Sequence, residues 1–381
     1  MPLVRFIHTS DLHLDTSFSG AGFPSRLGGR KREAIRAVLR RILGDARREA
    51  VDFALIAGDL FEHDRVTPDT VEFLKRQFAE ADPLPIYIAP GNHDPCVRGS
   101  PYRDAAWSGN VHIFRDEDIR SVEPEGTGVR ITGFGYNRAQ VRERLFRRLA
   151  PLPGDRINLL VAHASDVGRI PAGKVVHVPF AVEEIAGKNV RYCALGHYHQ
   201  QRPVANPIDA TQAWYCGIPE GRAWDEEGEC GYLLVEIEPD RVHVQARPCN
   251  LVPLRTITVV CDAFSTREQI LDAVLEHRGT ALDPATILRI RLTGAVDPKL
   301  DISIPEMEER LSGLALHIRW DNLTEPALDF DAIAGDSTLA GLFARELNRR
   351  IANCEGSRRA QLERARLYGV QALLGREVRL R

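Results

Sequence analysis

Two histidines that lie two residues apart, His197 and His199, are the first candidates for chemistry in this sequence. They follow the apolar run 192–195 within a Gly-His-Tyr-His motif. If that run is a buried strand, the alternation of side chains directs both imidazoles to the same side. Imidazoles placed in this way at the end of a strand can hold one metal ion or two adjacent ones. Two histidines of a surface loop would give the same short motif, so the argument depends on residues elsewhere in the chain.

Four more predicted strands end in residues that bind metals. With His197 and His199 included, the set contains two carboxylates, one amide and five imidazoles. A random scatter of the 12 histidines of the chain would not place five of them at strand ends. The residues and the strands before them are Asp11 and His13 after 3–8, Asp59 after 51–57, Asn92 and His93 after 84–89, and His163 after 156–162.

This mixture of nitrogen and oxygen ligands favours two divalent first-row metal ions, such as Mn, Fe or Zn. It differs from the all-oxygen sites of calcium and from structural zinc sites. A close pair of metals usually shares a bridging carboxylate. Asp59 is the best candidate for this bridge, because it is the single ligand on its strand end. Two metals about 3.5–4 Å apart can share a hydroxide. They can also stabilise both the attacking and the leaving oxygen of a phosphate.

The order of the predicted elements explains how these residues meet. Strands 3–8, 51–57 and 84–89 alternate with helices at 29–50 and 68–79, which is the pattern of a layered α/β sheet. In such sheets, ligands collect beyond the carboxyl ends of the strands. The face of the first helix that is rich in arginine is either a solvated surface or a stripe that contacts phosphates. Further predicted elements are strands at 111–114 and 129–134, a basic helix at 138–149, and antiparallel strands at 212–216, 231–238 and 242–247.

The chain divides into three predicted parts. Residues 1–250 form the domain with the metal ligands, and residues 251–325 form a compact βαββαβ-like unit without such a constellation. Residues 326–381 form a linker and a helical segment. The stretch with the character of a linker is 325–336. Two amphipathic helices, at 337–352 and 357–374, are expected in that segment. They either dock a partner protein or fold back on the middle unit and complete its core.

Composition sets broad limits on the kind of protein. Of the 381 residues, 44% are apolar and 27% are charged, which is typical of a globular protein. The formal net charge is −3, so the chain does not have the excess of basic residues that is typical of dedicated DNA-binding domains. The seven cysteines have no paired spacing, which favours a reducing compartment. Since no signal peptide or membrane-spanning run is apparent, we expect a cytoplasmic protein.

Taken together, the motifs resemble those of a known family. Asp-x-His, Gly-Asp-Leu-Phe, Gly-Asn-His-Asp, a lone histidine after an apolar strand, and Gly-His-x-His, in this order, look like the calcineurin-like metallophosphoesterases. The finer resemblance is to SbcD/YhaO-type DNA repair exonucleases and rests on segments 8–13, 194–199 and 217–228. The resemblance covers residues 1 to about 330. It implies a four-layer αββα metallophosphoesterase sandwich of the α/β class, with a small α/β capping domain and a helical C-terminal tail.

The resemblance also implies roles for the candidate residues. His93 is left free beside the leaving group as a general acid or a transition-state stabiliser. Many relatives carry Asp where this chain has Glu62, and some nucleases carry His there. Either Glu62 or its neighbour His63 is therefore expected to orient His93. One metal is expected on Asp11, His13, Asp59 and His199, and the other on Asp59, Asn92, His163 and His197.

These roles imply a subunit that hydrolyses DNA phosphodiesters as an exonuclease or endonuclease in DNA repair. Two divalent metal ions, with Mn²⁺ as the expected metal, are its cofactors. The expected partners are DNA and an SbcC/YhaN-like coiled-coil ATPase, with homodimer formation as a further option. The alternative function is hydrolysis of a small phosphodiester or phosphomonoester. A scaffold that has lost catalysis would show eroded ligands, and the ligand set is complete here.

Overall fold

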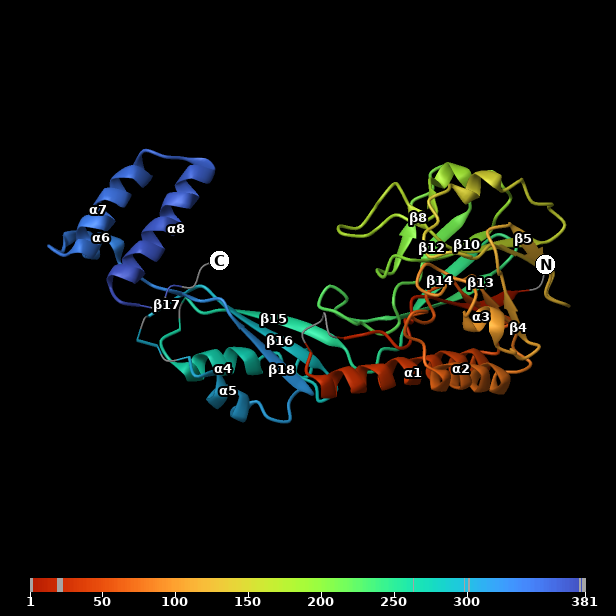
Figure 1. The fold of residues 1–381 in the computed structure, drawn as a ribbon, viewed down its shortest axis with the longest axis horizontal. Helices are drawn as coiled ribbons and strands as arrows, with labels where there is room; N and C mark the ends of the chain where they lie inside the picture. Colours follow the sequence, from red (N-terminus) through yellow and green to blue (C-terminus); the bar gives the residue numbers. More distant parts are fainter. Residues whose placement is uncertain are drawn as a thin grey trace. The chain divides into compact units, whose positions relative to one another are not determined.

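The computed structural model describes residues 3–18, 23–262, 264–297, 299–300, 302–376 and 378. Two compact units make up the chain. The first unit comprises Met1–Arg255 with Ala285–Ile287, and the second comprises Thr256–Pro284 with Leu288–Arg381. Figure 1 shows the first unit mainly in red to green and the second in cyan to blue. The candidate metal ligands all belong to the first unit.

Two six-stranded sheets form the first unit. The first sheet has the order β14 (Val242–Pro248), β13 (Gly231–Ile237), β1 (Val4–Thr9), β2 (Phe53–Ile56), β3 (Ile86–Ile88), β4 (Val111–Ile113). The second has the order β11 (Arg202–Val204), β12 (Gln212–Tyr215), β10 (Tyr192–Gly196), β7 (Ile157–His163), β6 (Val129–Gly133), β5 (Arg120–Val122). Strands β1 to β4 run parallel, as do β12, β10, β7 and β6. The carboxyl ends of each parallel set therefore lie at one edge of its sheet.

Three apolar cores hold the layers together. Phe6 and Phe53 of the first sheet meet Leu159 and Tyr192 of the second in the core between the sheets. Helices α1 (Ser25–Arg48) and α2 (Pro68–Glu80) cover the outer face of the first sheet, as Figure 1 shows. Short 3-10 helices, η2 (Leu145–Arg148) and η3 (Val182–Glu184), and their loops cover the outer face of the second sheet. The remaining elements of this unit are α3 (Pro101–Asp104), β8 (Ser165–Asp166) and β9 (Pro179–Phe180).

The predicted layers of sheet and helix are confirmed, whereas the helix predicted at 138–149 is wrong. Only η2 is helical in that stretch. Its apolar residues do recur at helical spacing, and they are buried against the second sheet. However, the carbonyl of Val141 accepts a hydrogen bond from Val178 N (2.7 Å), so the segment pairs with a distant loop. Tertiary pairing has overridden the local helical pattern here.

A buried ion pair joins distant parts of the first unit. Lys31 of α1 and Glu220 are both almost completely inaccessible to solvent, and Lys31 Nζ donates to a Glu220 carboxylate oxygen. Lys31 also donates to the carbonyl of Val252 (2.8 Å), and Glu220 accepts from Leu251 N (2.6 Å). The pair thus fixes α1, the segment around Glu220 and the end of the first unit to one another.

The second unit contains a three-stranded sheet with two helices on one face. The sheet has the order β15 (Leu254–Val260), β16 (Ile287–Thr293), β18 (His317–Asn322), and the helices are α4 (Arg267–Leu275) and α5 (Ile304–Arg310). Ile257 and Ile290 of the sheet pack against Ile270 and Met307 of the helices. Two short strands, β17 (Ala295–Val296) and β19 (Glu325–Pro326), pair in parallel.

The stretch predicted as a linker, 325–336, has regular structure. It contains β19 and the helix α6 (Phe330–Gly335). Asp329 begins this helix, because its carboxylate accepts from Ala332 N (2.9 Å) and Asp331 N (3.1 Å). The stretch is therefore a short strand followed by a capped helix rather than an irregular connection.

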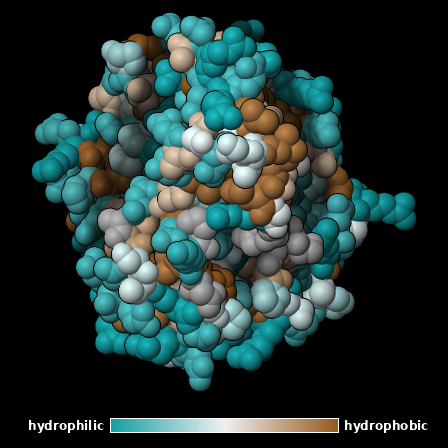
Figure 2. Space-filling model, turned by 90° about the vertical axis from the view of Figure 1, so that its left-hand side faces the viewer, coloured by the Kyte–Doolittle hydropathy of each residue, from teal (hydrophilic) through white to brown (hydrophobic). Residues whose placement is uncertain are grey.

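Two longer helices follow, α7 (Leu339–Ala352) and α8 (Gly356–Leu373), and they pack against each other. A Cβ atom added at Gly369 would overlap the Phe343 ring, so glycine allows the close approach of the two helices. Leu339 and Leu342 at the start of α7 are 67% and 56% exposed, and Leu373 and Leu374 at the end of α8 are also exposed. Figure 2 shows apolar side chains gathered in a patch on the face of this unit that carries these helices.

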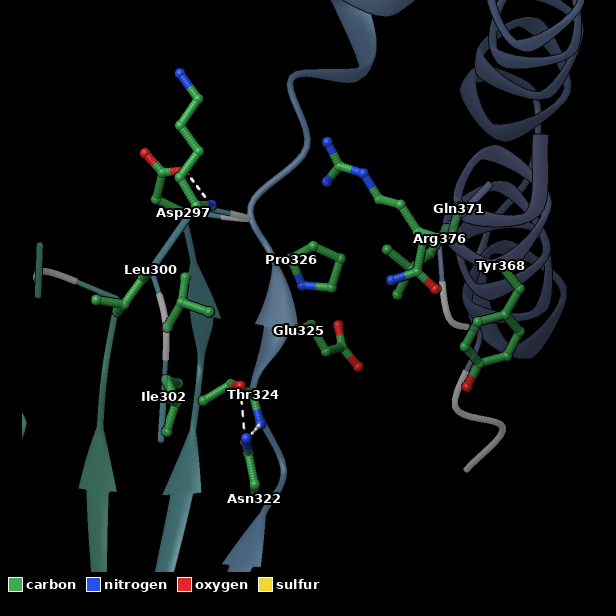
Figure 3. Close-up of a pocket in the computed structure, with 13 residues that line it drawn as sticks. Asp297, Leu300, Ile302, Asn322, Thr324, Glu325, Pro326, Tyr368, Gln371 and Arg376 are labelled. Atoms are coloured by element: carbon green, nitrogen blue, oxygen red, sulfur yellow. Dashed lines mark hydrogen bonds between the residues drawn. The ribbon is translucent and has the colours of Figure 1, made fainter. Parts of the chain in front are cut away.

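A cavity of about 550 Å³ lies within the second unit. Figure 3 shows Tyr368, Gln371 and Arg376 on one side of it and Leu300 and Pro326 on the other. The helical segment therefore lies beside the strands β17 and β19. Within the described ranges, none of the helices has both the length and the apolar character needed to cross a membrane.

The buried ion pair gives a test of the fold. We expect Lys31→Met to destabilise the first unit by about 3–5 kcal/mol, because Glu220 then remains buried without a cation. Urea denaturation followed by tryptophan fluorescence measures the loss. The double variant Lys31→Met with Glu220→Leu should recover part of the loss, since it buries no unpaired charge. An unchanged midpoint for Lys31→Met would contradict this account of the pair.

Candidate metal centre

The candidate ligands follow the carboxyl ends of β1, β2, β3, β7 and β10, as predicted from the sequence. Alternation along an extended strand, the reason given for the shared direction of His197 and His199, is wrong, and it does not apply to Asp11 and His13 either. Asp11 and His13 have φ angles of 54° and 49°, and His197 has 102°, so these residues lie in left-handed turns beyond the strands. Such conformations are costly for residues other than glycine and tend to occur at functional sites.

Backbone hydrogen bonds hold these turns side by side. Asp11 N donates to Gly58 O (2.9 Å), and His13 N donates to Asp59 O (2.9 Å). The turn after β1 is thus paired with the turn after β2. Two glycines let the other loops approach, because a Cβ atom added at Gly91 would overlap Asp59 and His163, and one at Gly196 would overlap Ala57 O. The glycines of Gly-Asn-His-Asp and Gly-His-x-His are therefore required by the packing of the site.

Most of the predicted ligand atoms come together in this arrangement. Each of three groups brings its candidate atoms within 4.8 Å of one another. Asn92 joins the set through His163, whose Nε2 lies 3.1 Å from Asn92 Oδ1 and 3.3 Å from Asp59 Oδ2. The His197 ring centroid lies 5.1 Å from that of His163. The three groups are Asp11, His13 and His199; Asp11, Asp59 and His163; and His13, Glu62 and His93.

Four of the imidazoles are held by acceptors on the side away from the ligand cluster. A carboxylate or a carbonyl can only accept, so the ring nitrogen that faces it carries the hydrogen. In the neutral ring the other nitrogen then keeps its lone pair, as metal-binding histidines require. The four pairs are His13 Nδ1 with Glu62 Oε1 (2.8 Å), His163 Nδ1 with Ala57 O (2.9 Å), His197 Nε2 with Val175 O (2.8 Å), and His199 Nδ1 with Glu226 Oε1 (2.5 Å).

The inward nitrogen of His13 shows that these residues fit a cation. His13 Nε2 is buried and has no hydrogen-bond partner within the described part of the chain. It lies 3.6 Å from Asp59 Oδ2 and 3.9 Å from Asp11 Oδ1. A buried lone pair that faces two carboxylates is unfavourable unless a positive charge lies among them. A divalent metal ion would supply that charge, and His13 Nε2, Asp59 and Asp11 are the residues that would hold it.

The protonation of the site agrees with this interpretation. Burial and the charge of Arg222 lower the pKa of His13 to about 4, and burial and the charge of His163 lower the pKa of His197 to about 3. Both rings are therefore neutral at neutral pH, as ligands must be. Burial alone would lower the pKa of His163, but the charge of Asp59 raises it to about 9. The Asp59 carboxylate thus favours a positive charge at the position of His163.

His93 lies at the mouth of the site, with its side chain 44% exposed. Its backbone N–H donates to Asp59 Oδ1 (2.9 Å), and its Nδ1 lies 2.8 Å from Glu62 Oε2. Glu62 therefore holds His93 with one oxygen and His13 with the other. Burial would raise the pKa of Glu62, but the hydrogen bonds from His13 and His93 hold it well below its usual range. His63 contacts His93 through its backbone N–H, which donates to the His93 carbonyl (2.8 Å).

Several residues of the site were missed as functional candidates in the sequence. Asp94 accepts hydrogen bonds from Asp59 N (3.0 Å), Leu60 N (2.7 Å) and Gly91 N (2.6 Å), so it joins the turns after β2 and β3. Its place at the end of Gly-Asn-His-Asp was a usable signal. Lys174 Nζ lies 3.2 Å from His199 Nε2, and a single lysine in a loop gives no such signal. Arg222 and Glu226, which lie in the segment 217–228, were noticed only as part of the resemblance.

Comparison with curated proteins finds relatives that are named either as a metallophosphoesterase or as DNA double-strand break repair proteins. The chain is 31% identical over 240 residues to an uncharacterized metallophosphoesterase, YhaO, of Bacillus subtilis, which covers 61% of this chain and 57% of that protein. It is 28% identical to the DNA double-strand break repair protein Mre11 of Haloferax volcanii, over 68% of this chain and 55% of that protein. The chain thus spans little more than half the length of these two relatives. With Mre11 of Halobacterium salinarum it shares 25% identity over 90% of this chain and 92% of that protein.

The chain was also compared with solved structures and with family profiles. A dimetal phosphatase of Danio rerio is 13% identical, with a TM-score of 0.43, over 65% of this chain and 97% of that one. The profile described as calcineurin-like phosphoesterase matches residues 4–201, more than half of the chain, and includes every candidate ligand. The chain belongs to the calcineurin-like phosphoesterase family.

Proposed function

We propose that this chain is the nuclease subunit of a DNA repair complex and hydrolyses DNA phosphodiesters with two Mn²⁺ ions. The observation that carries the proposal is the ligand cluster around Asp59, with four imidazoles that are each held through one ring nitrogen by an acceptor outside the cluster. The relatives named as DNA double-strand break repair proteins support DNA as the substrate. The second unit also favours a large substrate, because a hydrolase of small phosphoesters needs no such addition.

In this proposal the ligands are those of the resemblance. Asp59 is common to both metals, and the residues around it complete each site. When bound, the two ions activate water and neutralise the charge of the phosphate. One metal is assigned to Asp11, His13, Asp59 and His199, and the other to Asp59, Asn92, His163 and His197.

His93 supplies the proton in this proposal. Hydrolysis leaves an alkoxide on the departing sugar, and that oxygen needs a proton. Glu62 accepts the Nδ1–H of His93 (2.8 Å), so Nε2 is the atom that delivers a proton to the leaving oxygen. Burial would lower the pKa of His93, but the hydrogen bond to Glu62 and the charge of Asp59 raise it above its ordinary value. Both neighbours therefore favour the protonated form of His93 relative to a free imidazole.

The first test concerns the metals and the substrate. The purified protein should degrade end-labelled duplex or single-stranded DNA only with a divalent metal, and best with manganese. Asp59→Asn should lose bound metal and nuclease activity together, because it removes the shared carboxylate. Asp64→Asn, an exposed carboxylate in the same loop, is the matched control and should change neither.

Two outcomes would contradict the proposal. Full activity in excess chelator would exclude the two-metal mechanism. Hydrolysis of a chromogenic phosphodiester without any cleavage of DNA would favour the alternative function, a phosphoesterase of small molecules.

The second test separates the general acid from the ligands. His93→Ala should retain both metals and lose about a hundred- to ten-thousand-fold in turnover, the usual contribution of general acid catalysis. Glu62→Ala should lower turnover less, and it should also weaken metal binding because Glu62 holds His13 as well. Metal content by mass spectrometry and turnover are measured in parallel. If metal content falls in His93→Ala as it does in Asp59→Asn, His93 is a ligand instead. A larger loss of turnover in His63→Ala than in Glu62→Ala would give the orienting role to His63.

The exposed apolar patch formed by Leu339, Leu342, Leu373 and Leu374 is the proposed docking site for an SbcC/YhaN-like coiled-coil ATPase. Helices α7 and α8 are joined by a short turn and run antiparallel, so the start of α7 and the end of α8 lie at the same end of the pair. An amphipathic helix of a partner can bury such a patch.

Substitutions in this patch test the docking. Leu342→Asp combined with Leu373→Asp should abolish co-purification of the co-expressed ATPase, because both side chains are exposed and available for contact. Melting temperature and basal nuclease activity should stay unchanged. Ile208→Asp, at an exposed apolar residue of the first unit, is the control and should retain the ATPase. A double variant that unfolds at lower temperature would assign the patch to the packing of the second unit itself.

A further inference from the structure

Two charged residues of the segment 217–230 contact the metal centre from one side. Glu226 Oε1 lies 2.5 Å from His199 Nδ1, and Glu226 Oε2 accepts from Arg222 N (2.7 Å). The Arg222 guanidinium returns to the same carboxylate, with Nη2 3.2 Å from Glu226 Oε1. Both Glu226 oxygens are thus engaged, one by His199 and the guanidinium and the other by the backbone.

Arg222 also reaches the carboxylate on the other side of the site. Its Nη1 lies 3.7 Å from Glu62 Oε1, the oxygen that accepts from His13. The guanidinium therefore lies between Glu226, which holds His199, and Glu62, which holds His13 and His93. Planar guanidinium groups suit this bridging position because they present several donors in fixed directions.

The backbone of this segment is anchored in the protein interior. Glu220, two residues before Arg222, forms the buried pair with Lys31. A Cβ atom added at Gly221 would overlap the carbonyl of Glu226, so a tight turn brings Arg222 and Glu226 together. The two side chains thus project from a rigid base, which limits their freedom to leave the site.

The geometry points to Arg222 and Glu226 as positioning residues of the metal centre. We propose that Glu226 fixes the His199 ring so that Nε2 faces Asp11 (3.6 Å) in the ligand cluster, and that Arg222 holds the Glu226 and Glu62 carboxylates in place. This inference rests on the proposed function, because it takes His199 as a metal ligand. It extends that function by assigning roles to two residues that are themselves outside the ligand set. Carboxylates that hold metal-binding histidines typically contribute 10–100-fold to metal affinity or activity.

Metal binding measures these roles directly. The full-length chain is stripped with chelator, dialysed and titrated with Mn²⁺ by calorimetry. Glu226→Ala should weaken Mn²⁺ binding by about 10–100-fold. Glu226→Gln should be intermediate, because the amide oxygen still accepts from His199 but the charge for Arg222 is lost. Arg222→Gln should weaken binding less than Glu226→Ala, and Arg222→Lys should restore it only in part since lysine cannot bridge both carboxylates.

The control is Glu229→Ala, which removes an exposed carboxylate of the same segment and should leave Mn²⁺ affinity unchanged. Equal affinity of the wild type and Glu226→Ala would overturn the inference and leave the proposed function intact. A wild-type chain that binds no divalent metal would overturn both. If Glu226→Ala fails to fold, the Glu226→Gln and Arg222→Gln titrations decide, and unchanged affinity in both would overturn the inference.

Discussion

The burial of two carboxylates, Asp11 and Asp59, among imidazoles is the constraint on which the first unit depends. Both side chains are almost completely inaccessible to solvent. A buried charge is costly unless hydrogen bonds and opposite charge compensate for it. The backbone supplies part of this compensation, because His197 N donates to Asp11 (3.2 Å) and His93 N donates to Asp59 (2.9 Å). The rest requires positive charge at the atoms that the imidazoles face, so the site is stable only as a place for cations.

The two sheets must also be held in a fixed relation, because the ligands come from both. Hydrogen bonds between the sheets do this close to the site. His163 at the end of β7 donates to Ala57 O after β2 (2.9 Å). His8 of β1 lies 2.9 Å from the hydroxyl of Tyr192 and 3.2 Å from Leu195 O, both on β10. These contacts are polar links in an otherwise apolar interface, and they allow only one register of the sheets. The same residues that shape the core therefore set the distances between the ligands.

The strand-end ligands could be predicted because the carboxyl ends of parallel strands meet at one edge, whatever the local turn. The left-handed turns at Asp11 and His197 could not be predicted, since they depend on partners that are distant in the chain. Asp11 N donates to Gly58 O, and His197 N donates to the Asp11 carboxylate. Glu62 was considered only as a partner of His93, because a sequence does not show that its second oxygen reaches His13. No periodicity links Glu226 to His199 across 27 residues, and only the fold brings them together. The 138–149 segment failed as a helix for a related reason, because Val141 pairs with Val178.

Electrostatics finally explains why an acidic site can serve a phosphate substrate. Four carboxylates, those of Asp11, Asp59, Glu62 and Glu226, lie around the ligand cluster. Arg222 is already engaged by two of them, so its charge is largely used within the protein. A phosphodiester would be repelled by this set, and bound cations reverse the local sign of the potential. The modest net charge of −3 is therefore compatible with a nucleic acid substrate, because attraction at the reacting phosphate depends on the metals rather than on a basic surface.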